Sequence, residues 1–294
     1  MTIDIICPLY QAENYIEKLH KSLLKQKNVK INNIQYILTR SKDDSEEILK
    51  KNNLNYKVIE KKDFSHSLVR ENAAMESNAD IICFISQDIV IETEDWLEKL
   101  VEPIINGQAE ATYSRQLTKF NNVEKYTREA NYPEKSRIKS KADINELGLK
   151  TFFFSDASSA VKTDIFKKLN GYDGKNLPIN EDMYLAHKLI TNGYKIGYQA
   201  DSVVYHSHNF GLKELYDRYK LTGKFFKGNS YLDKYGTNLS GGSLAKYILK
   251  RAIQDKNIKV LIRYPFDMAA RLIGMKVGKM WYGKRFDFNN CPCL

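Results

Sequence analysis

Short runs of apolar residues alternate along the chain with stretches in which apolar residues recur every three or four positions. The helical spacing covers residues 13–27, 44–51, 68–77 and 96–103, and the apolar runs cover residues 3–8, 34–38, 56–59 and 81–85. This order predicts an α/β fold with a doubly wound, mostly parallel sheet and helices on both faces. Residues 81–85 are apolar on both faces of the pleat, as expected for a central strand covered by helices.

Three polar residues, Ser86-Gln87-Asp88, follow the predicted central strand. Because ligands of open α/β sheets bind beyond the carboxyl ends of the strands, Asp88 is placed at the expected ligand edge. A lone Asp after a strand is also a common turn residue, so its position alone does not decide its role. The first turn between strand and helix, residues 8–13, contains no glycine, which argues against a dinucleotide-binding or P-loop enzyme.

The chain has 294 residues, of which 43% are hydrophobic and 28% charged. This composition is typical of a globular protein and excludes a disordered, collagenous or repeat-dominated chain. The formal net charge is +10, and residues 207–294 hold 17 Lys and Arg against 6 Asp and Glu, so the excess lies in the last third. The sequence therefore predicts a near-neutral body, residues 1–210, and a helical, basic C-terminal extension, residues 211–294.

The four cysteines are too few and too unevenly spaced to predict a disulfide framework. Cys7 and Cys83 lie inside apolar runs and are expected to be reduced core residues. Cys291 and Cys293 have no second ligand pair, so a plain tail is expected there rather than a metal site. With no apolar run near the ~18–20 residues that span a bilayer and no basic leader, we expect a cytoplasmic protein.

Four groups of residues carry a resemblance to a known family: Pro8-Leu9-Tyr10 with Glu13, Arg70-Glu71-Asn72, Ser86-Gln87-Asp88 and Asn180-Glu181-Asp182. Their order and spacing over residues 1–210 resemble the inverting family-2 glycosyltransferases, which have the GT-A fold. Ser-Gln-Asp in place of Asp-x-Asp, with residues 113–116 and 204–209, is similar to bacterial rhamnosyltransferases of surface polysaccharide synthesis. The resemblance implies single-displacement transfer of a sugar, rhamnose from dTDP-rhamnose, to a growing cell-surface glycan or lipid-linked acceptor.

Departure of a nucleoside diphosphate requires positive charge near the leaving oxygens. Asp88 is the candidate metal ligand, and the expected cofactor is a divalent cation, Mg²⁺ or Mn²⁺, because both prefer hard oxygen donors. His206 follows a predicted strand that ends at the same edge, and the resemblance points to a metal-binding His there. His208 lies on the same side of the extended segment and competes for this role. Gln87 replaces the usual first Asp of the motif, which weakens the metal prediction.

The resemblance implies that Asp182 is the catalytic base and that Glu181 holds acceptor hydroxyls or shapes the loop. Asn180 is predicted to cap the following helix, which ends near Asn192-Gly193. The helix macrodipole alone also favours acidic residues in a first turn, so a purely structural role for both acids stays open.

Donor contacts are expected from the positions that match the family motifs. Pro8, Tyr10 and Glu13 would line the base and ribose pocket, with Gln87 and Asp88 beside the diphosphate. Arg70 would approach the diphosphate or make a surface ion pair.

A second departure from the family concerns the nucleobase. Residues 38–41 stand where many members have Asp-Asp-Gly-Ser, which leaves Thr39 as the candidate to hydrogen-bond the base. The choice between a dTDP-linked and a UDP-linked donor therefore stays open.

Residues 152–160 pass from aromatic to small and polar side chains, and small side chains permit close approach by a sugar. In the family that the chain resembles, a similar stretch precedes the acceptor site, so Ser155 and Asp156 are expected to contact the acceptor. The remaining histidines, His20, His66 and His187, have no obvious partners in the sequence and are expected to be structural or exposed.

The basic extension is predicted to be helical from residue 212, and Pro265 is expected to open a final amphipathic helix. Its basic residues, with Trp281 and Tyr282 nearby, suit an anionic membrane interface, so contact with the inner membrane surface is one expectation. Packing of the helix on the catalytic body is the other. Without a zinc-finger, RRM or helix-turn-helix signature, no nucleic-acid partner is expected.

Two alternatives to an enzyme remain at this level. A non-catalytic sugar-nucleotide or glycan-binding module on the same fold is kept open by Gln87 and Thr39. An adaptor that binds membranes or nucleic acid through the basic extension is the other. The sequence does not indicate an oligomeric state.

Overall fold

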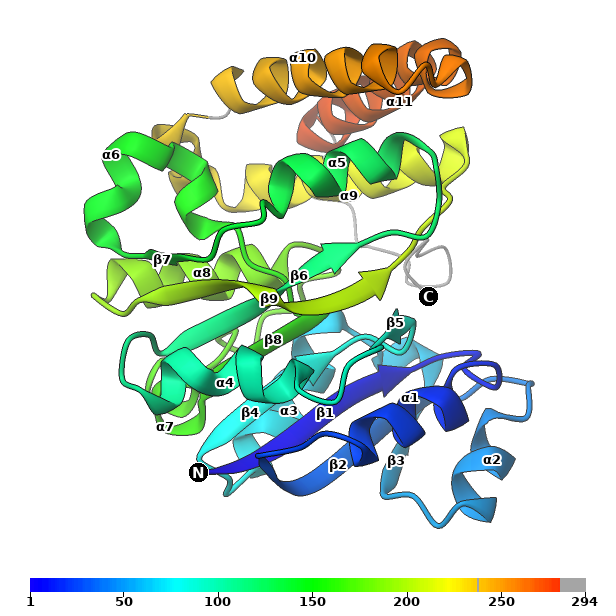
Figure 1. Cartoon of the computed structure of the whole chain (residues 1–294), viewed down its shortest axis with the longest axis vertical. Helices are drawn as coiled ribbons and strands as arrows, with labels where there is room; N and C mark the ends of the chain where they lie inside the picture. The colour runs from blue at the N-terminus through cyan, green and yellow to red at the C-terminus, as the bar shows by residue number, and fades with distance from the viewer. Residues whose placement is uncertain (237, 281–294) are drawn as a thin grey trace.

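A nine-stranded sheet forms the centre of the computed structural model, which describes residues 1–236 and 238–280 (Figure 1). The strand order is β3-β2-β1-β4-β8-β6-β9-β5, and β7 pairs with β9. The strands are β1 (Thr2–Leu9), β2 (Lys30–Thr39), β3 (Tyr56–Ile59), β4 (Ile81–Ile85), β5 (Ile89–Val90), β6 (Ala111–Leu117), β7 (Arg137–Lys139), β8 (Ser158–Lys162) and β9 (Ile196–His206). Strands β5, β7 and β8 are antiparallel to their neighbours and the other pairs are parallel, which confirms the predicted mostly parallel sheet.

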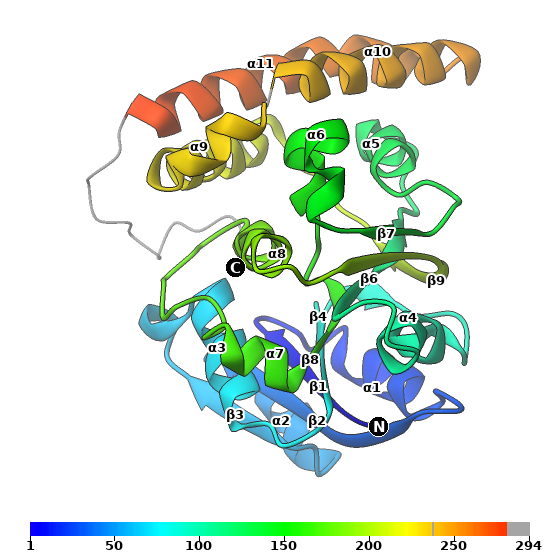
Figure 2. The ribbon, with the colours of Figure 1, turned by 90° about the vertical axis from the view of Figure 1, so that its left-hand side faces the viewer.

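Helices cover both faces of the sheet (Figure 2). One core lies between the sheet and α3, α7 and α8, and a second core lies between the sheet and α1, α2 and α4. The α-helices are α1 (Ile16–Leu24), α2 (Ser45–Lys51), α3 (His66–Glu76), α4 (Trp96–Ile105), α5 (Val123–Asn131), α6 (Ile144–Leu147), α7 (Thr163–Lys168), α8 (Glu181–Thr191), α9 (Leu212–Gly228), α10 (Asn238–Gln254) and α11 (Ile258–Met280). Short 3₁₀ turns are η1 (Lys61–Asp63), η2 (Lys141–Asp143), η3 (Gly148–Phe152) and η4 (Ser230–Tyr235).

Strand β4 has the predicted bounds, and every residue in it is buried. Ile82 and Phe84 belong to one core, and Cys83 between them belongs to the other, as the two-residue period of a strand requires. Cys7 and Cys83 are both free and buried, as predicted, whereas Cys291 and Cys293 lie outside the described residues.

The first helix begins later than the predicted residue 13. Gln11 has a positive φ of 47°, and the residues that follow form a turn before α1 starts at Ile16. Ser45 accepts a hydrogen bond from the Ala12 amide at 2.7 Å, and Asp43 accepts one from the Glu13 amide at 3.2 Å. These side chains hold the turn against the start of α2, which a helix running from residue 13 would not allow.

The final helix corrects the prediction for Pro265, which lies inside α11 rather than at its start. Proline has no N–H and interrupts one helical hydrogen bond, but Pro265 is exposed, where water can bond the freed carbonyl. Helix α11 packs on α9 through glycines. A Cβ atom on Gly274 or Gly278 would overlap the α9 backbone, so only glycine allows this close contact.

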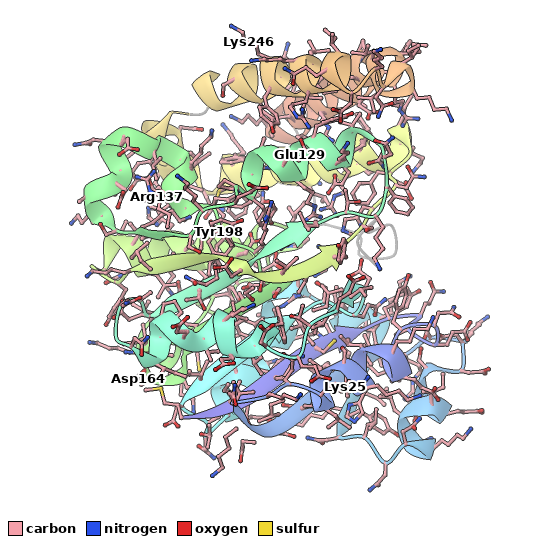
Figure 3. The ribbon with its side chains drawn as sticks, viewed as in Figure 1. Lys25, Glu129, Arg137, Asp164, Tyr198 and Lys246 are labelled. Carbon is pink, nitrogen blue, oxygen red and sulfur yellow. The ribbon has the colours of Figure 1, made fainter. Side chains whose placement is uncertain are left out.

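The C-terminal helices also pack on α5. A small core joins Val123 and Tyr126 of α5 to Ile248, Val260 and Tyr264 of α10 and α11. At its edge, Glu129 of α5 accepts a hydrogen bond from Arg251 of α10 at 3.2 Å, and Lys246 projects from the outer side of α10 (Figure 3). The expected packing of the extension on the body is therefore confirmed for α10 and α11. Within the described ranges, no helix has the length and apolarity needed to cross a membrane.

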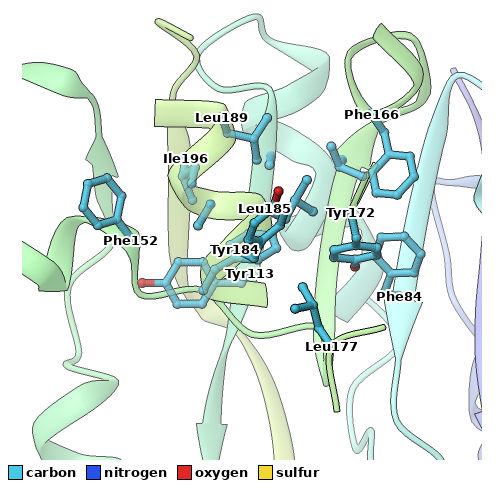
Figure 4. Close-up of a cluster of buried hydrophobic side chains, with 14 of the residues drawn as sticks. Phe84, Tyr113, Phe152, Phe166, Tyr172, Leu177, Tyr184, Leu185, Leu189 and Ile196 are labelled. Atoms are coloured by element: carbon cyan, nitrogen blue, oxygen red, sulfur yellow. The ribbon is translucent and has the colours of Figure 1, made fainter. Parts of the chain in front are cut away.

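Aromatic side chains fill the core beside the ligand edge of the sheet (Figure 4). Phe84 lies 5.7 Å from Phe166, and Phe166 lies 5.7 Å from Tyr172, measured between ring centroids. The Tyr172 hydroxyl donates a 2.6 Å hydrogen bond to Asp156. The core thus supports a buried carboxylate in the wall of the site described next.

Candidate active site

A cleft of about 400 Å³ opens beyond the carboxyl ends of β1 and β4. Most of the residues predicted to form the site line it: Pro8, Tyr10, Arg70, Gln87, Asp88, Ser155, Asp156, Glu181, Asp182, His206 and His208. These residues come from segments far apart in the sequence, and the parallel sheet brings their strand ends to one edge. The predicted convergence of the two acidic segments and the histidines is therefore present in the structure.

Asp88, His206 and His208 form a cluster at this edge. Each offers one ligand atom, and the three atoms lie within 4.8 Å of one another. The Asp88 carboxylate is 3.4 Å from His206 Nε2 and 3.9 Å from His208 Nδ1. The two-residue strand β5 causes this proximity, because Ile89, next to Asp88, pairs with His206 at the end of β9.

The charges in this cluster suit a cation. Burial alone would raise the pKa of Asp88, but the neighbouring His206 and His208 outweigh it and hold that pKa below its usual value. Burial and the His206 ring lower the pKa of His208 to about 3, so this imidazole is neutral and has a free lone pair at neutral pH. One carboxylate and two imidazoles can hold a divalent cation with positions left for phosphate, and the two imidazoles favour a transition ion such as Mn²⁺ over Mg²⁺.

Gln116 fixes the orientation of the His206 ring. Its side-chain oxygen lies 3.0 Å from His206 Nδ1, and its amide nitrogen donates to Ser155 at 2.8 Å. Because Nδ1 faces the Gln116 oxygen, the Nε2 atom of His206 faces Asp88. Sequence analysis included Gln116 in a family-like segment but gave it no role.

The hydrogen bonds of Gln87 give a physical reason why Gln stands here in place of the first Asp of the family motif. Its oxygen accepts from the Tyr10 amide at 2.7 Å, and its nitrogen donates to the Tyr10 carbonyl at 2.9 Å. A carboxylate cannot donate the second of these bonds. Gln87 therefore joins the loops after β1 and β4 and positions Tyr10 in the cleft.

We expect Gln87→Glu to raise the donor KM about tenfold, because one hydrogen bond is lost and a charge then faces the Tyr10 carbonyl. Steady-state kinetics with varied donor would measure the change. Gln108→Glu, at an exposed position, adds the same charge away from the cleft and should leave the donor KM as it is. Equal donor KM values for Gln87→Glu and the unaltered protein would contradict the positioning role.

Asp182 and Glu181 lie in the first turn of α8, as predicted. The expected side-chain cap by Asn180 is wrong: Asn180 has a left-handed φ of 57°, and its side chain makes no capping bond. Asp182 instead accepts a 2.7 Å hydrogen bond from the Met183 amide. Asn adopts the left-handed region more readily than other residues with a Cβ, so Asn180 can turn the chain into α8 at this point.

Arg70 lies beneath these acids and not at the surface. It is 4% exposed, and its Nη1 atom is 3.5 Å from a Glu181 oxygen, which makes a buried ion pair. The surface ion pair considered for Arg70 is therefore ruled out. Its Nε atom is buried without a hydrogen-bond partner among the described residues.

Three acids near Arg70, namely Asp156, Glu181 and Asp182, have raised pKa values. Burial, together with Glu181 and Asp156, raises the pKa of Asp182 well above its usual value. Burial also raises the pKa of Glu181, against the opposing effect of Arg70, and raises the pKa of Asp156 to about 6. Asp182 is thus a stronger base than an ordinary carboxylate, as abstraction of a hydroxyl proton requires.

The two predicted acceptor residues differ in their surroundings. Ser155 lines the cleft and accepts a hydrogen bond from Gln116. Asp156 is 2% exposed and bonds both the Tyr172 and Ser159 hydroxyls, at 2.6 and 2.9 Å. Contact between either residue and an acceptor stays a prediction.

Two predicted donor residues do not line the cleft. Glu13 is exposed, and its carboxylate accepts from the Asp44 amide at 3.1 Å. Thr39 is fully buried at the end of β2, with its hydroxyl unpaired among the described residues. Their roles in binding the donor stay predictions.

The cleft also contains residues that the sequence did not single out, including His66, Phe210 and Arg218. His66 was expected to be structural or exposed, but it forms part of the cleft wall. A lone side chain in a loop or at a helix start gives no periodic signal. His20 and His187 are outside the cleft and bond the hydroxyls of Tyr36 and Tyr235 at 2.9 and 3.2 Å, as structural residues do.

Comparison with known proteins identifies the family to which the chain belongs. The family model described as glycosyl transferase family 2 matches residues 4–170. The chain is a family 2 glycosyltransferase. This glycosyltransferase is 32% identical over 289 residues to the O-antigen chain rhamnosyltransferase RfbN of Salmonella typhimurium, covering 96% of this chain and 90% of RfbN. It is 33% identical to the O-antigen chain rhamnosyltransferase WbaN of Salmonella anatum, over 71% of this chain and 67% of WbaN.

Solved glycosyltransferases share the fold. The mannosyltransferase PcManGT of Pyrobaculum calidifontis, solved with GDP-Man and Mn²⁺, aligns with a TM-score of 0.64 at 15% identity. The alignment covers 95% of this glycosyltransferase and 87% of the PcManGT chain. The expected GT-A fold and the expected enzyme class are thereby confirmed.

Proposed function

We propose that this glycosyltransferase moves rhamnose from dTDP-rhamnose to a growing cell-surface glycan or lipid-linked acceptor and inverts the anomeric carbon. The observation that carries the proposal is one cleft holding both a basic carboxylate, Asp182, and the Asp88–His206–His208 cluster. Similarity to two rhamnosyltransferases over most of the chain supports the choice of sugar.

In the proposed reaction, the acceptor hydroxyl attacks the anomeric carbon while the bond from that carbon to the diphosphate oxygen breaks. Asp182 takes the hydroxyl proton, and the nucleoside diphosphate leaves with the electron pair of the broken bond. A divalent cation held by Asp88, His206 and His208 would neutralise charge on the leaving diphosphate. Arg70 compensates the buried charge of Glu181 and so limits the repulsion between Glu181 and ionised Asp182, which lets Asp182 be ionised before it takes the proton.

A nucleotide panel tests the proposal. We expect dTDP with Mn²⁺ to raise the melting temperature more than UDP or GDP does, since bound ligand stabilises the folded state. Incubation of dTDP-rhamnose with a surface-glycan acceptor should release dTDP and give a product of inverted anomeric configuration by NMR. Preference for GDP, or retained configuration, would contradict the proposal.

We also propose that α11 lies on an anionic membrane surface. The helix packs on α9 with one face and leaves an apolar stripe uncovered on the opposite face. Ile262, Phe266 and Met280 in this stripe are 66%, 59% and 77% exposed. Exposed Lys259 and Arg263 lie beside it, and together these features suit an interfacial helix that contacts anionic lipid headgroups.

We expect the Ile262→Asp/Phe266→Asp variant to bind anionic vesicles at least about tenfold more weakly, because two apolar side chains are lost from the interface. Flotation with vesicles of 30% phosphatidylglycerol would measure binding, beside purely zwitterionic vesicles. Leu24→Asp/Ile105→Asp makes the same change at exposed residues of α1 and α4 and should bind normally. Full binding by the α11 variant would exclude this surface.

A further inference from the structure

A second cavity, of about 260 Å³, adjoins the catalytic cleft. The residues that line both are Ser155, His206, His208, Phe210 and Arg218. The remaining walls come from α5, α9 and α11, with Gln116 of β6, Tyr132 after α5 and Phe153 after η3, so this cavity lies between the catalytic sheet and the C-terminal helices. We call it the arginine cavity, because Arg128, Arg218 and Arg271 line it.

Aromatic rings hold the three guanidinium groups. Arg128 lies 5.7 Å from the centroid of Tyr132, and Arg271 lies 5.0 Å from that of Tyr219. Arg218 lies 4.8 Å from the centroid of Phe210, at the boundary with the cleft. Stacking restrains the guanidinium groups, so Arg271 loses little side-chain freedom when it bonds an oxyanion. Arg128 is already bonded to Glu124, Gln116 and His206 and contributes its charge.

The cavity carries an excess of positive charge. Among its described lining residues, Glu124 is the one carboxylate, and it accepts from Arg128 Nε at 2.9 Å. Arg271 donates from Nη1 to the Tyr219 hydroxyl at 2.7 Å. Its Nε atom is buried and has no partner in residues 1–236 and 238–280. A buried donor left unpaired destabilises the protein, and an oxyanion in the cavity would satisfy it.

The arginine cavity also leads toward the surface of α11. A third cavity, of about 300 Å³, shares Glu124, Phe210 and Arg271 with it. Lys259 and Arg263, which lie beside the exposed apolar stripe of α11, line this outer cavity. Neighbouring cavities with shared walls thus extend from the catalytic cleft to the helix proposed to contact a membrane.

We propose that the arginine cavity binds a phosphate or diphosphate group of the acceptor while the acceptor sugar reaches Asp182. This inference rests on the proposed glycosyl transfer. The diphosphate of the donor is assigned elsewhere, because Asp88, Gln87 and Tyr10 line the catalytic cleft and do not line the arginine cavity. Arg128 and Arg271, conversely, line the arginine cavity and not the cleft.

Inorganic pyrophosphate is a direct probe of this site. With dTDP saturating and EDTA present, we expect calorimetry to show one pyrophosphate bound per chain, with affinity about 10- to 100-fold lower in Arg271→Gln. Arg271→Lys keeps the charge and should lose less. Arg251→Gln removes an Arg from α10, outside the arginine cavity, and should bind as the unaltered protein does.

Transfer assays separate the source of the phosphate. For an alkyl-diphosphate-linked glycan, Arg271→Gln should raise the acceptor KM by a similar factor, with the donor KM unchanged. For the same glycan as a plain alkyl glycoside, the variant and the unaltered protein should have equal acceptor KM values, which a merely structural role of Arg271 would not produce.

The experiments distinguish failure of the arginine-cavity proposal from failure of the proposed glycosyl transfer. Competition between pyrophosphate and dTDP, or equal pyrophosphate affinity in Arg271→Gln, would overturn the arginine-cavity proposal. Absence of transfer from every nucleotide sugar would overturn the proposed function, whereas pyrophosphate binding would still report on the cavity.

Discussion

Replacement of Asp182 by Asn is expected to lower kcat about 10²- to 10⁴-fold, the range that a positioned general base contributes. Asn keeps the size of the side chain and its contact with the Met183 amide but cannot take a proton. Affinity for dTDP should therefore change little. Single-turnover transfer and dTDP calorimetry would measure the two effects separately.

Asp164→Asn is a matched control for this variant. Asp164 also lies in the first turn of a helix, α7, but is exposed and does not line the cleft. It should retain normal turnover. Normal turnover by Asp182→Asn as well would reject Asp182 as the base and return it to the structural role that the helix macrodipole alone can explain.

The pH dependence of turnover follows from the same carboxylate. Asp182 acts as a base only when ionised, so kcat/KM should rise with pH as this group loses its proton. Because its pKa is raised well above the ordinary value, the rise should occur at higher pH than for an exposed carboxylate. Asp182→Asn should lack this limb of the pH profile.

Asp182→Asn should also melt at a higher temperature at neutral pH. A raised pKa means that the folded state disfavours the ionised form relative to the unfolded chain, so stability is lost as the pH rises from the ordinary carboxyl pKa to the raised pKa of Asp182. The neutral amide removes this cost, and the gain should vanish at acid pH where Asp182 is protonated. Loss of activity with gain of stability is the expected behaviour of a strained functional site.

Local sequence patterns predicted much of the fold because they report local structure. Strands β3 and β4 have the expected bounds, since each is a compact apolar run beside a turn. Pairing between distant segments carries no such signal. The antiparallel insertion of β8 between β4 and β6, and the pairing of β5 with β9, follow from tertiary packing.

The two histidines show the same limit at the site. The sequence treated His206 and His208 as competitors because both follow one strand. The structure places both rings beside Asp88, with their centroids 4.3 Å apart, so the two residues act together rather than as alternatives in forming the cluster. Arg218 comes from the predicted basic extension and Phe210 is the last residue of the predicted body, and no motif linked either of them to the cleft.

The apolar pattern of α11 predicted an amphipathic helix but not which surface its apolar face contacts. The apolar stripe was predicted, but the face that packs on α9 contains Gly274 and Gly278 and not the stripe. Close backbone contact at small residues leaves Phe266 and Ile273 exposed. The positions predicted at Trp281 and Tyr282 lie outside the described residues.

Asp88→Asn is expected to weaken Mn²⁺ binding at least about 100-fold, since removal of a direct ligand should exceed the 10- to 100-fold effect of removing a group behind one. The amide is neutral, and two imidazoles alone lack the hard anionic oxygen that these cations prefer. Electron paramagnetic resonance would count free Mn²⁺ without relying on turnover. Asp201→Asn, at an exposed position of β9, removes the same charge and should bind Mn²⁺ normally.

The histidine variants complete this test of the metal site. His206→Ala should weaken Mn²⁺ binding by a similar factor, because Gln116 holds His206 with Nε2 facing Asp88, 3.4 Å away. His208→Ala should have a comparable effect if the cation uses the whole cluster, and a much smaller one if His206 is the sole imidazole ligand. Unchanged Mn²⁺ affinity in Asp88→Asn and in both histidine variants would exclude the cluster as a cation site.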